Sequence, residues 1–193
     1  MNKNLRILVV MAMLAAFVGM SLSCDSSSTG YKTFSLEKGI GHFSFEYPAR
    51  YKVEITEVRT DLQYTHVTFS SPFSKELRDS TFITVFVAPP DDASPNSEAL
   101  LEKSLASAEV LDDFRFVERF SLTVAGVQGQ EVVYSYGRLV SNYENVRIPE
   151  FMREVYFDRG GLIWSVSMRS NQSMAEADEA DFEHVLQTFK ILE

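Results

Sequence analysis

The chain has 193 residues, 45% of them hydrophobic, and a formal net charge of −9 at pH 7. This length is sufficient for one domain with a substantial hydrophobic core. The negative charge argues against a nucleic-acid partner and against docking to anionic lipid headgroups by charge alone, because both surfaces attract Lys and Arg. A single cysteine, Cys24, excludes an intramolecular disulfide, so the core must hold the fold by itself.

Residues 1–23 have the order of a secretory signal peptide. Lys3 and Arg6 precede an uncharged apolar run over residues 7–20, which is shorter than the roughly 20 residues that a membrane-spanning helix needs. The small residues Ser21 and Ser23 follow, and Cys24 comes next. This arrangement resembles the lipobox of bacterial lipoproteins, although Ser21 stands where that motif usually has Leu.

The resemblance implies that the signal peptide ends at residue 23 and that Cys24 is the lipid-attachment residue. In such lipoproteins the cysteine carries several acyl chains, for example palmitate, because one chain alone anchors a protein only marginally. We therefore expect an exported protein, anchored to the outer side of the cytoplasmic membrane or elsewhere in the cell envelope. The alternatives are ordinary cleavage with a free Cys24 thiol and an uncleaved membrane anchor.

A small, polar stretch follows the cysteine. Residues 24–30 (CDSSSTG) are typical of a flexible tether, which we place over residues 24–36. Residues 37–193 contain no internal repeat and no second linker, so we expect a single globular domain there.

Short strands of alternating hydrophobicity dominate this domain. Phe43, Phe45 and Tyr47 alternate with polar residues, and Pro48 ends that strand. Residues 81–88 (TFITVFVA) are apolar on both faces, as expected in the middle of a sheet. The predicted strands are 42–47, 51–59, 64–69, 81–88, 115–122, 130–136, 151–158 and 162–168, with a short final strand within 189–192.

Two helices interrupt the strands. Ser94 as N-cap and Pro95 at the first position predict a helix whose apolar positions are Leu100, Leu101, Leu105 and Ala108. Ser173 and Glu176 form a capping box for a second helix with an apolar stripe at Phe182, Val185, Leu186 and Phe189. Gly160 and Gly161 predict a tight hairpin between the last two long strands. The fold class is α+β, a three-layer α/β/α sandwich with a mainly antiparallel central sheet and a helix on each face.

Three segments carry a further resemblance. They are FSFEYPARYKV near the start of the domain, the hairpin REVYFDRGGLIWSVSM, and the terminal DFEHVLQTFKIL. Their order resembles the PsbP-like family, whose fold is shared with a small Ran-binding nuclear import factor, over about residues 39–192. The resemblance implies binding, assembly or scaffolding rather than catalysis. It transfers no functional residue, because the family has no shared catalytic motif.

No catalytic, cofactor-binding or metal-binding residues are predicted. His42, His66 and His184 lie in separate elements without metal-ligand spacing, so we expect ordinary surface histidines and no cofactor. Gly39 and Gly41 are spaced like the start of a phosphate loop, but a strand follows where such a loop needs a helix.

Two polar segments allow more than one interpretation. The acidic run Glu176, Asp178, Glu179, Asp181 and Glu183 is predicted to be a solvated helix face, with a partner-binding acidic patch as the alternative. Residues 137–150, which include Arg138, Tyr143 and Arg147, form a long connection between strands. We expect a disordered loop or an elongated hairpin, and a functional loop is the alternative.

The leading hypothesis is a membrane-anchored, non-enzymatic binding or assembly protein of the cell envelope with an unknown protein partner. A second hypothesis is an enzyme that uses dispersed carboxylates, which requires two converging acidic groups with perturbed pKa values. A third is a small-ligand carrier with Trp164 and Tyr156 lining a cavity, although a plain core position is the expected role of Trp164.

Overall fold

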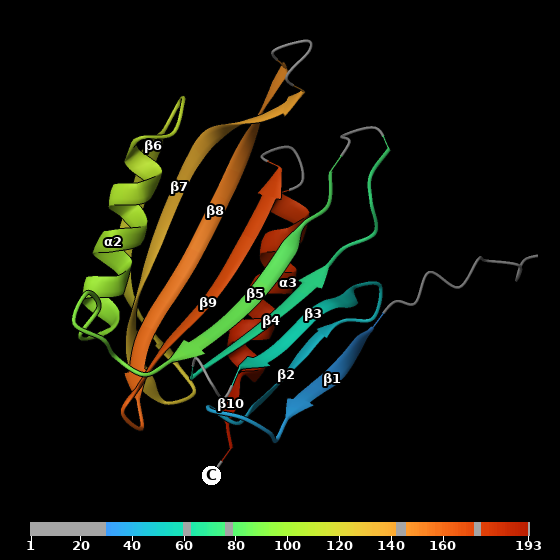
Figure 1. The fold of residues 1–193 in the computed structure, drawn as a ribbon. Coiled ribbons are helices and arrows are strands. Elements are labelled where there is room, and N and C mark those ends of the chain that lie inside the picture. The colour runs from blue at the N-terminus through green and yellow to red at the C-terminus, as the bar shows by residue number, and fades with distance from the viewer. Residues whose placement is uncertain (1–29, 60–62, 76–78, 142–145, 172–174, 193) are drawn as a thin grey trace, which may run out of the picture.

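The computed structural model describes residues 30–59, 63–75, 79–141, 146–171 and 175–192, which form two antiparallel sheets and two helices (Figure 1). The predicted α+β class is confirmed. The division of the strands into two separate sheets was not predicted. No helix among the described residues is long and apolar enough to span a bilayer.

The larger sheet has seven strands in the order β3-β4-β5-β9-β8-β7-β6, and every neighbouring pair is antiparallel. β5, predicted to lie mid-sheet, pairs with β4 and β9 as expected. The edge strands are β3 and β6. The bounds are β3 Lys52–Arg59, β4 Tyr64–Ser70, β5 Phe82–Ala88, β6 Arg115–Val124, β7 Val127–Ser141, β8 Val146–Arg159 and β9 Leu162–Asn171.

The smaller sheet joins β1 (Tyr31–Leu36), β2 (Phe43–Pro48) and β10 (Lys190–Ile191). β1 corrects the tether predicted over residues 24–36, because residues 31–36 are paired along their whole length with β2. The alternation of polar and apolar residues in β1 was missed because a Ser-rich segment precedes it. Phe34 and Leu36 pack against the core, whereas residues 24–29 lie outside the described residues.

The helices α2 (Ser97–Glu109) and α3 (Ala175–Thr188) cover opposite faces of the larger sheet. Successive residues of a strand point to opposite faces. On β8, Tyr156 packs in one apolar cluster with Leu101 of α2, whereas Val155 packs in the other cluster with Phe182 of α3. In Figure 1, α2 lies beside β7 and β8 and α3 lies behind the middle of the sheet.

The main core lies between α3, the smaller sheet and one face of the larger sheet. Phe43 and Phe45 of β2 stack on Phe189, with ring centroids 5.6 and 5.8 Å apart. The predicted stripe on the second helix is confirmed, because its members Phe182, Val185, Leu186 and Phe189 are all buried. Gly41 permits this close packing, since a Cβ there would lie 2.6 Å from Val87 Cγ1.

The N-cap residue of α2 differs from the predicted one. The N-cap of α2 is Asn96 and not Ser94, and its side chain accepts a hydrogen bond from the backbone N–H of Ala99. Ser94 instead lies in a tight turn, where its backbone N–H donates to Asp91 Oδ1. The other predicted N-cap, Ser173, lies outside the described residues.

Two long hairpins join β7 to β8 and β8 to β9. Gly160 and Gly161 have φ of +64° and +73° and join β8 directly to β9, which confirms the predicted tight turn. Residues 137–141 and 146–150 pair across the connection between β7 and β8, so the elongated-hairpin interpretation is confirmed for them. Residues 142–145, including Tyr143, lie outside the described part of the chain.

Candidate functional site

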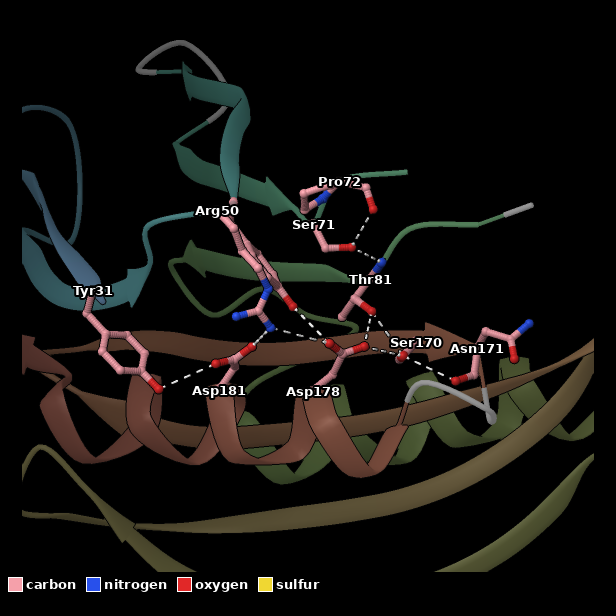
Figure 2. A network of polar contacts seen from close by, with 10 residues as sticks. Tyr31, Arg50, Ser71, Pro72, Thr81, Ser170, Asn171, Asp178 and Asp181 are labelled. Atoms are coloured by element: carbon pink, nitrogen blue, oxygen red, sulfur yellow. Dashed lines mark hydrogen bonds and ion pairs between the residues drawn. The ribbon is translucent and has the colours of Figure 1, made fainter. Parts of the chain in front are cut away.

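Two aspartates of α3 face the end of the larger sheet where β5 begins and β9 ends. Asp178 and Asp181 are spaced one helical turn apart, so both side chains lie on the same side of α3. Only 3% of Asp178 and 6% of Asp181 is exposed. Figure 2 shows the two carboxylates directed at side chains from other segments of the chain, among them Tyr31, Arg50 and Thr81.

Asp178 accepts hydrogen bonds from hydroxyl groups on both of its oxygens. Thr81 Oγ1 and Ser170 Oγ donate to Oδ2, the latter at 2.8 Å, and Tyr51 Oη donates to Oδ1 at 3.3 Å. These donors come from the turn before β3, the start of β5 and the end of β9. The aspartate therefore ties α3 to three other segments of the chain.

Asp181 is held by a cation instead. Arg50 Nη2 forms an ion pair with Asp181 Oδ2, and Tyr31 Oη donates to Oδ1 at 3.4 Å. Burial raises the pKa of the Asp181 carboxyl above its ordinary value, and Arg50 opposes that rise. Burial, together with the negative charge of Asp178, likewise raises the pKa of the Tyr51 hydroxyl, which keeps it a donor.

The predicted solvated face is therefore wrong for Asp178 and Asp181. The helical spacing places both of them toward Thr81, Ser170 and Arg50, and polar residues distant in sequence then satisfy the buried carboxylates. The prediction failed because two of these partners are remote in the sequence: Thr81 is 97 residues from Asp178, and Arg50 is 131 residues from Asp181. The side chain of Glu176 lies outside the described residues.

A second pair of carboxylates lies at the same end of the sheet. Arg138 binds Glu150 through Nε and Asp79 through Nη2, the latter at 2.7 Å. Glu150 is 1% exposed, and its Oε2 lies 3.3 Å from Arg169 Nε without forming a hydrogen bond. Burial raises the pKa of Glu150, and the two arginines oppose that rise.

A third ion-pair cluster joins α3 to the sheet. Arg153 donates through Nε to Glu131 Oε1 at 2.5 Å and through Nη2 to Glu183 Oε1 at 2.6 Å. Glu131 is fully buried, and its Oε2 has no hydrogen-bond partner among the described residues. Glu183 thus extends from α3 to an arginine of β8, and its side chain stays half exposed.

One buried carboxylate on the opposite face is bound only through hydroxyl groups in the described structure. Glu154 Oε2 accepts from Ser104 Oγ at 2.9 Å and from Tyr134 Oη at 3.1 Å. Burial raises the pKa of Glu154, and these hydrogen bonds oppose the rise. The contact fixes α2 onto β7 and β8.

Each of these carboxylates is bound by side chains from other elements of the fold. Asp178 and Glu154 accept hydrogen bonds from hydroxyl donors, and Asp181, Glu150 and Glu131 each bind an arginine. Such donors offset part of the cost of burying the carboxylate charge. Within the described ranges, no three His, Cys, Asp or Glu side chains gather as metal ligands would.

A different part of the molecule presents apolar side chains to solvent. We call Val110, Leu111, Phe116, Val117 and Phe120 the β6 surface, since they lie on the edge strand β6 or on the loop before it. Their exposed fractions range from 39% for Phe120 to 83% for Val110. Because β6 is an edge strand, no strand in the described part of the chain pairs with one side of its backbone.

A groove of about 600 Å³ adjoins the β6 surface. β7 continues beyond the start of β6, and along this stretch the backbone N–H of Gly137 donates to Asp112 O at 2.7 Å. Phe116, Val117 and Ile148 supply apolar walls. The groove is therefore partly apolar, and it continues the line of the edge strand. Its lining residues are Asp113, Arg115, Phe116, Val117, Ser135, Tyr136, Gly137, Arg147, Ile148 and Pro149.

The residues singled out from the sequence are dispersed in the structure. His42, directly before β2, and His66, on β4, are half-buried, and His184 stacks on Tyr31 and lies 2.8 Å from Glu46 Oε2. Trp164 is a core residue, as expected, with 1% exposure. Cys24 lies outside the described residues.

The arginines of the connection over 137–150 are held by carboxylates. Arg138 binds Glu150 and Asp79, and Arg147 binds Asp112. Sequence reasoning missed the β6 surface, although the exposed Phe116 and Phe120 lie within a strand that was predicted. These side chains are exposed because β6 lies at the edge of the sheet. The order of the strands in the sheet cannot be read from the sequence pattern.

Comparison with solved structures identifies the fold. LpqN of Mycobacterium tuberculosis, described as involved in cell envelope biogenesis, matches with a TM-score of 0.59 and 10% identity, covering 86% of this chain and 94% of its own. Cyanobacterial PsbP (CyanoP) of Synechocystis sp. PCC 6803 matches with a TM-score of 0.55 and 9% identity, covering 90% and 99%. The Ran-binding protein Mog1p of Saccharomyces cerevisiae gives 0.54 and 10%, covering 86% and 97%.

The chain thus has the PsbP-like fold, and the predicted resemblance is confirmed at the level of fold. No family model matches the sequence, and the search of curated proteins gives no match either.

Proposed function

We propose that this chain is a membrane-anchored, non-enzymatic protein of the cell envelope that binds another protein or assists an assembly. The signal-peptide pattern over residues 1–23 and the lipobox-like Cys24 support the location. The description of LpqN, a protein of the same fold, as involved in cell envelope biogenesis supports the setting.

The observation that carries the binding role is the β6 surface. Five large apolar side chains are exposed on adjoining segments, next to a groove of about 600 Å³ and an unpaired strand edge. Exposed apolar side chains beside a groove and a strand edge are typical of protein-binding sites, and here Phe116 and Phe120 flank the edge from the two faces of the sheet. The occupant that fits an open strand edge is an extended polypeptide, which adds a strand and inserts apolar side chains beside it.

Site-specific photocrosslinking in intact cells tests the binding role. A photoreactive amino acid replaces Phe116 or Phe120 in the full-length protein, and a third variant carries it at Val53 on the other edge strand, β3. We expect one discrete crosslinked partner from Phe116 and Phe120 and none from Val53. Equal crosslinking from all three positions, or none from β6, contradicts the proposal.

Fatty-acid labelling tests the anchor separately. Cells fed a clickable fatty acid are expected to label the wild-type chain but not the Cys24→Ala variant. The wild-type protein is also expected to enter the detergent-rich phase on extraction, and the variant the aqueous phase. Label retained by Cys24→Ala contradicts the anchor.

The non-enzymatic part of the proposal draws support from the buried carboxylates. The enzyme alternative needs a converging acidic pair that is available to a substrate. Asp178 and Asp181 converge, but Thr81, Ser170 and Arg50 bind them. Activity in a general screen of hydrolase substrates that Asp178→Asn abolished, with the fold intact, would favour the enzyme.

A further inference from the structure

We propose that the domain rests on the bilayer through one defined surface, which contacts anionic lipid headgroups. We call it the basal patch, and it consists of Tyr31, Lys32, Arg50, Lys52, Phe73 and Lys75. The inference rests on the lipid anchor of the proposed function and adds the side of the domain that faces the lipid.

The register of the strands places these residues at one end of the molecule. Tyr31 lies opposite Pro48, and the backbone N–H of Ala49 donates to Gly30 O at 2.8 Å. Lys52 lies opposite Ser70 at the start of β3, and Phe73 follows Ser70 by three residues. The basal patch is therefore continuous with the point at which the chain enters β1.

Two side chains of the basal patch also converge on the same buried group. Tyr31 Oη and Arg50 Nη2 both bind the carboxylate of Asp181. Arg50 additionally lies over the ring of Tyr51, with its Cζ 5.2 Å from the ring centroid. The side chain of Arg50 nevertheless stays 45% exposed, so its guanidinium is accessible from outside.

The short chain between Cys24 and Tyr31 limits how far this end can lie from the membrane. Seven residues at full extension span at most about 25 Å, since each contributes about 3.3–3.6 Å. The headgroup layer itself takes up roughly 5–8 Å of that length. The 14 residues of β8 extend over about 45 Å, which is longer than the tether. The opposite end of the sheet could therefore contact the bilayer only if the whole domain were inverted.

The exposed chemistry of the basal patch suits a lipid interface. Phe73 is 62% exposed and Tyr31 is 44% exposed, and aromatic rings are favoured at the level of the headgroups. Lys32, Lys52 and Lys75 are exposed around them. Near an anionic surface, ammonium groups of this kind are attracted within about one Debye length.

The opposite end of the sheet lacks this combination of exposed aromatic rings and lysines. Its exposed charged side chains are mixed and include the acids Glu37, Asp91, Asp92 and Asp158 as well as Lys38, Arg59 and Arg159, and the exposed large apolar residues all lie elsewhere among the described residues. Net negative charge opposes binding of the free domain to anionic lipid, but a tethered domain needs only to be oriented. The difference between the two ends orients it. Glu54, whose Oε1 accepts from Ser70 Oγ at 2.5 Å, is the exposed acid closest along β3 to Lys52.

Depth-dependent fluorescence quenching tests the orientation. The full-length protein is purified from membranes and reconstituted into vesicles of phosphatidylcholine with phosphatidylglycerol. A second cysteine, introduced as Pro72→Cys beside the basal patch or as Asp92→Cys at the opposite end, carries a thiol-reactive dye. With a nitroxide on the lipid headgroup, we expect quenching several times stronger at position 72 than at position 92.

Charge reversal tests the chemistry with a matched control. Lys32→Glu, Lys52→Glu and Lys75→Glu are combined in one variant, and Lys38→Glu, Lys103→Glu and Lys190→Glu in another, since all six lysines are exposed. Both variants change the net charge equally. We expect the first to lose most of the quenching contrast in anionic vesicles and the second to keep it.

The outcomes separate the orientation from the anchor. A chain without the added cysteine must exclude the dye, because an acylated Cys24 has no free thiol. Dye uptake there overturns the anchor and the orientation together. Exclusion of the dye combined with equal quenching at positions 72 and 92 overturns the orientation alone, and equal effects of both triple variants overturn the role of the basal patch.

Discussion

At the scale of single residues, buried polar groups define this domain. Asp178, Glu154, Glu150 and Glu131 are each at most 9% exposed, and each is bound to a hydroxyl group or an arginine from another element. A buried carboxylate without such partners is strongly unfavourable. These contacts therefore fix which elements lie together as well as how tightly they pack.

Asp178→Ala is expected to destabilise the domain by about 3–5 kcal/mol, because it leaves the hydroxyl groups of Thr81, Ser170 and Tyr51 buried without their acceptor. Chemical denaturation followed by circular dichroism measures the loss. Glu179→Ala on the same helix is the control, since Glu179 is more exposed. Equal losses in both variants would contradict the clamp.

Glu154→Gln is expected to stabilise the domain above neutral pH, by about 1 kcal/mol. Burial raises the pKa of Glu154 in the folded state, so the folded protein binds more protons than the unfolded chain between the ordinary and the raised pKa. Stability is then lost as the pH rises through that window. Melting temperatures from pH 4 to pH 8 check this: the advantage of the Gln variant should vanish at the acidic end.

At the scale of elements, local sequence signals decide where strands and helices begin. At the start of α2, two neighbouring residues are candidates for the N-cap. Ser94 and Asn96 are both suitable caps, but the Asp91–Ser94 turn already uses the backbone of Ser94. Asn96 is then the first residue whose side chain can accept from the third N–H of the helix.

Asn96→Ala is expected to cost about 1 kcal/mol of stability, because the N–H of Ala99 loses its acceptor. Ser94→Ala should cost less if Asn96 is the cap. Asn96→Asp provides a control that keeps an accepting oxygen at the same place. Thermal unfolding of the three variants measures the order. A larger loss for Ser94→Ala than for Asn96→Ala would show that the helix starts earlier.

Most elements were predictable from the sequence, because the alternation of polar and apolar residues and the turn residues are patterns within a few neighbouring residues. β2, β4, β5 and β9 lie at their predicted places, and the Gly160–Gly161 turn connects the expected strands. β1 was missed, since its apolar side chains find their partners only in a separate sheet. Long-range partners such as Arg50 with Asp181 are not encoded in any local pattern, so the buried clusters and the β6 surface required the structure.

At the scale of the whole molecule, two sheets share one apolar core. Phe43 of β2 contacts Trp164 of β9 edge-on, with ring centroids 6.0 Å apart. Gly41, at φ +68°, brings the smaller sheet close to Val87 and Trp164. The junction is therefore built on tight contact between aromatic rings and a residue without a side chain.

Gly41→Ala is expected to loosen this junction and to lower stability by about 2 kcal/mol or more. The added Cβ would lie 2.9 Å from Trp164 Cη2, and the left-handed backbone alone costs roughly 1–2 kcal/mol for a residue with a side chain. Trp164 fluorescence should shift to longer wavelength at lower denaturant concentration than in the wild type. Gly126→Ala is the control, since nothing lies within 4 Å of its Cβ position.

The core of this domain is completed by α3 and β10, which follow all other described elements in the chain. Phe182, Val185, Leu186 and Phe189 fill the space between the two sheets, and β10 pairs with the early strand β2. A nascent chain that ends after β9 has α2 on one face of the larger sheet, but it lacks α3 to cover the face that lines the main core. The main core of such a chain stays open, so we expect the domain to fold only after α3 and β10 have been synthesised.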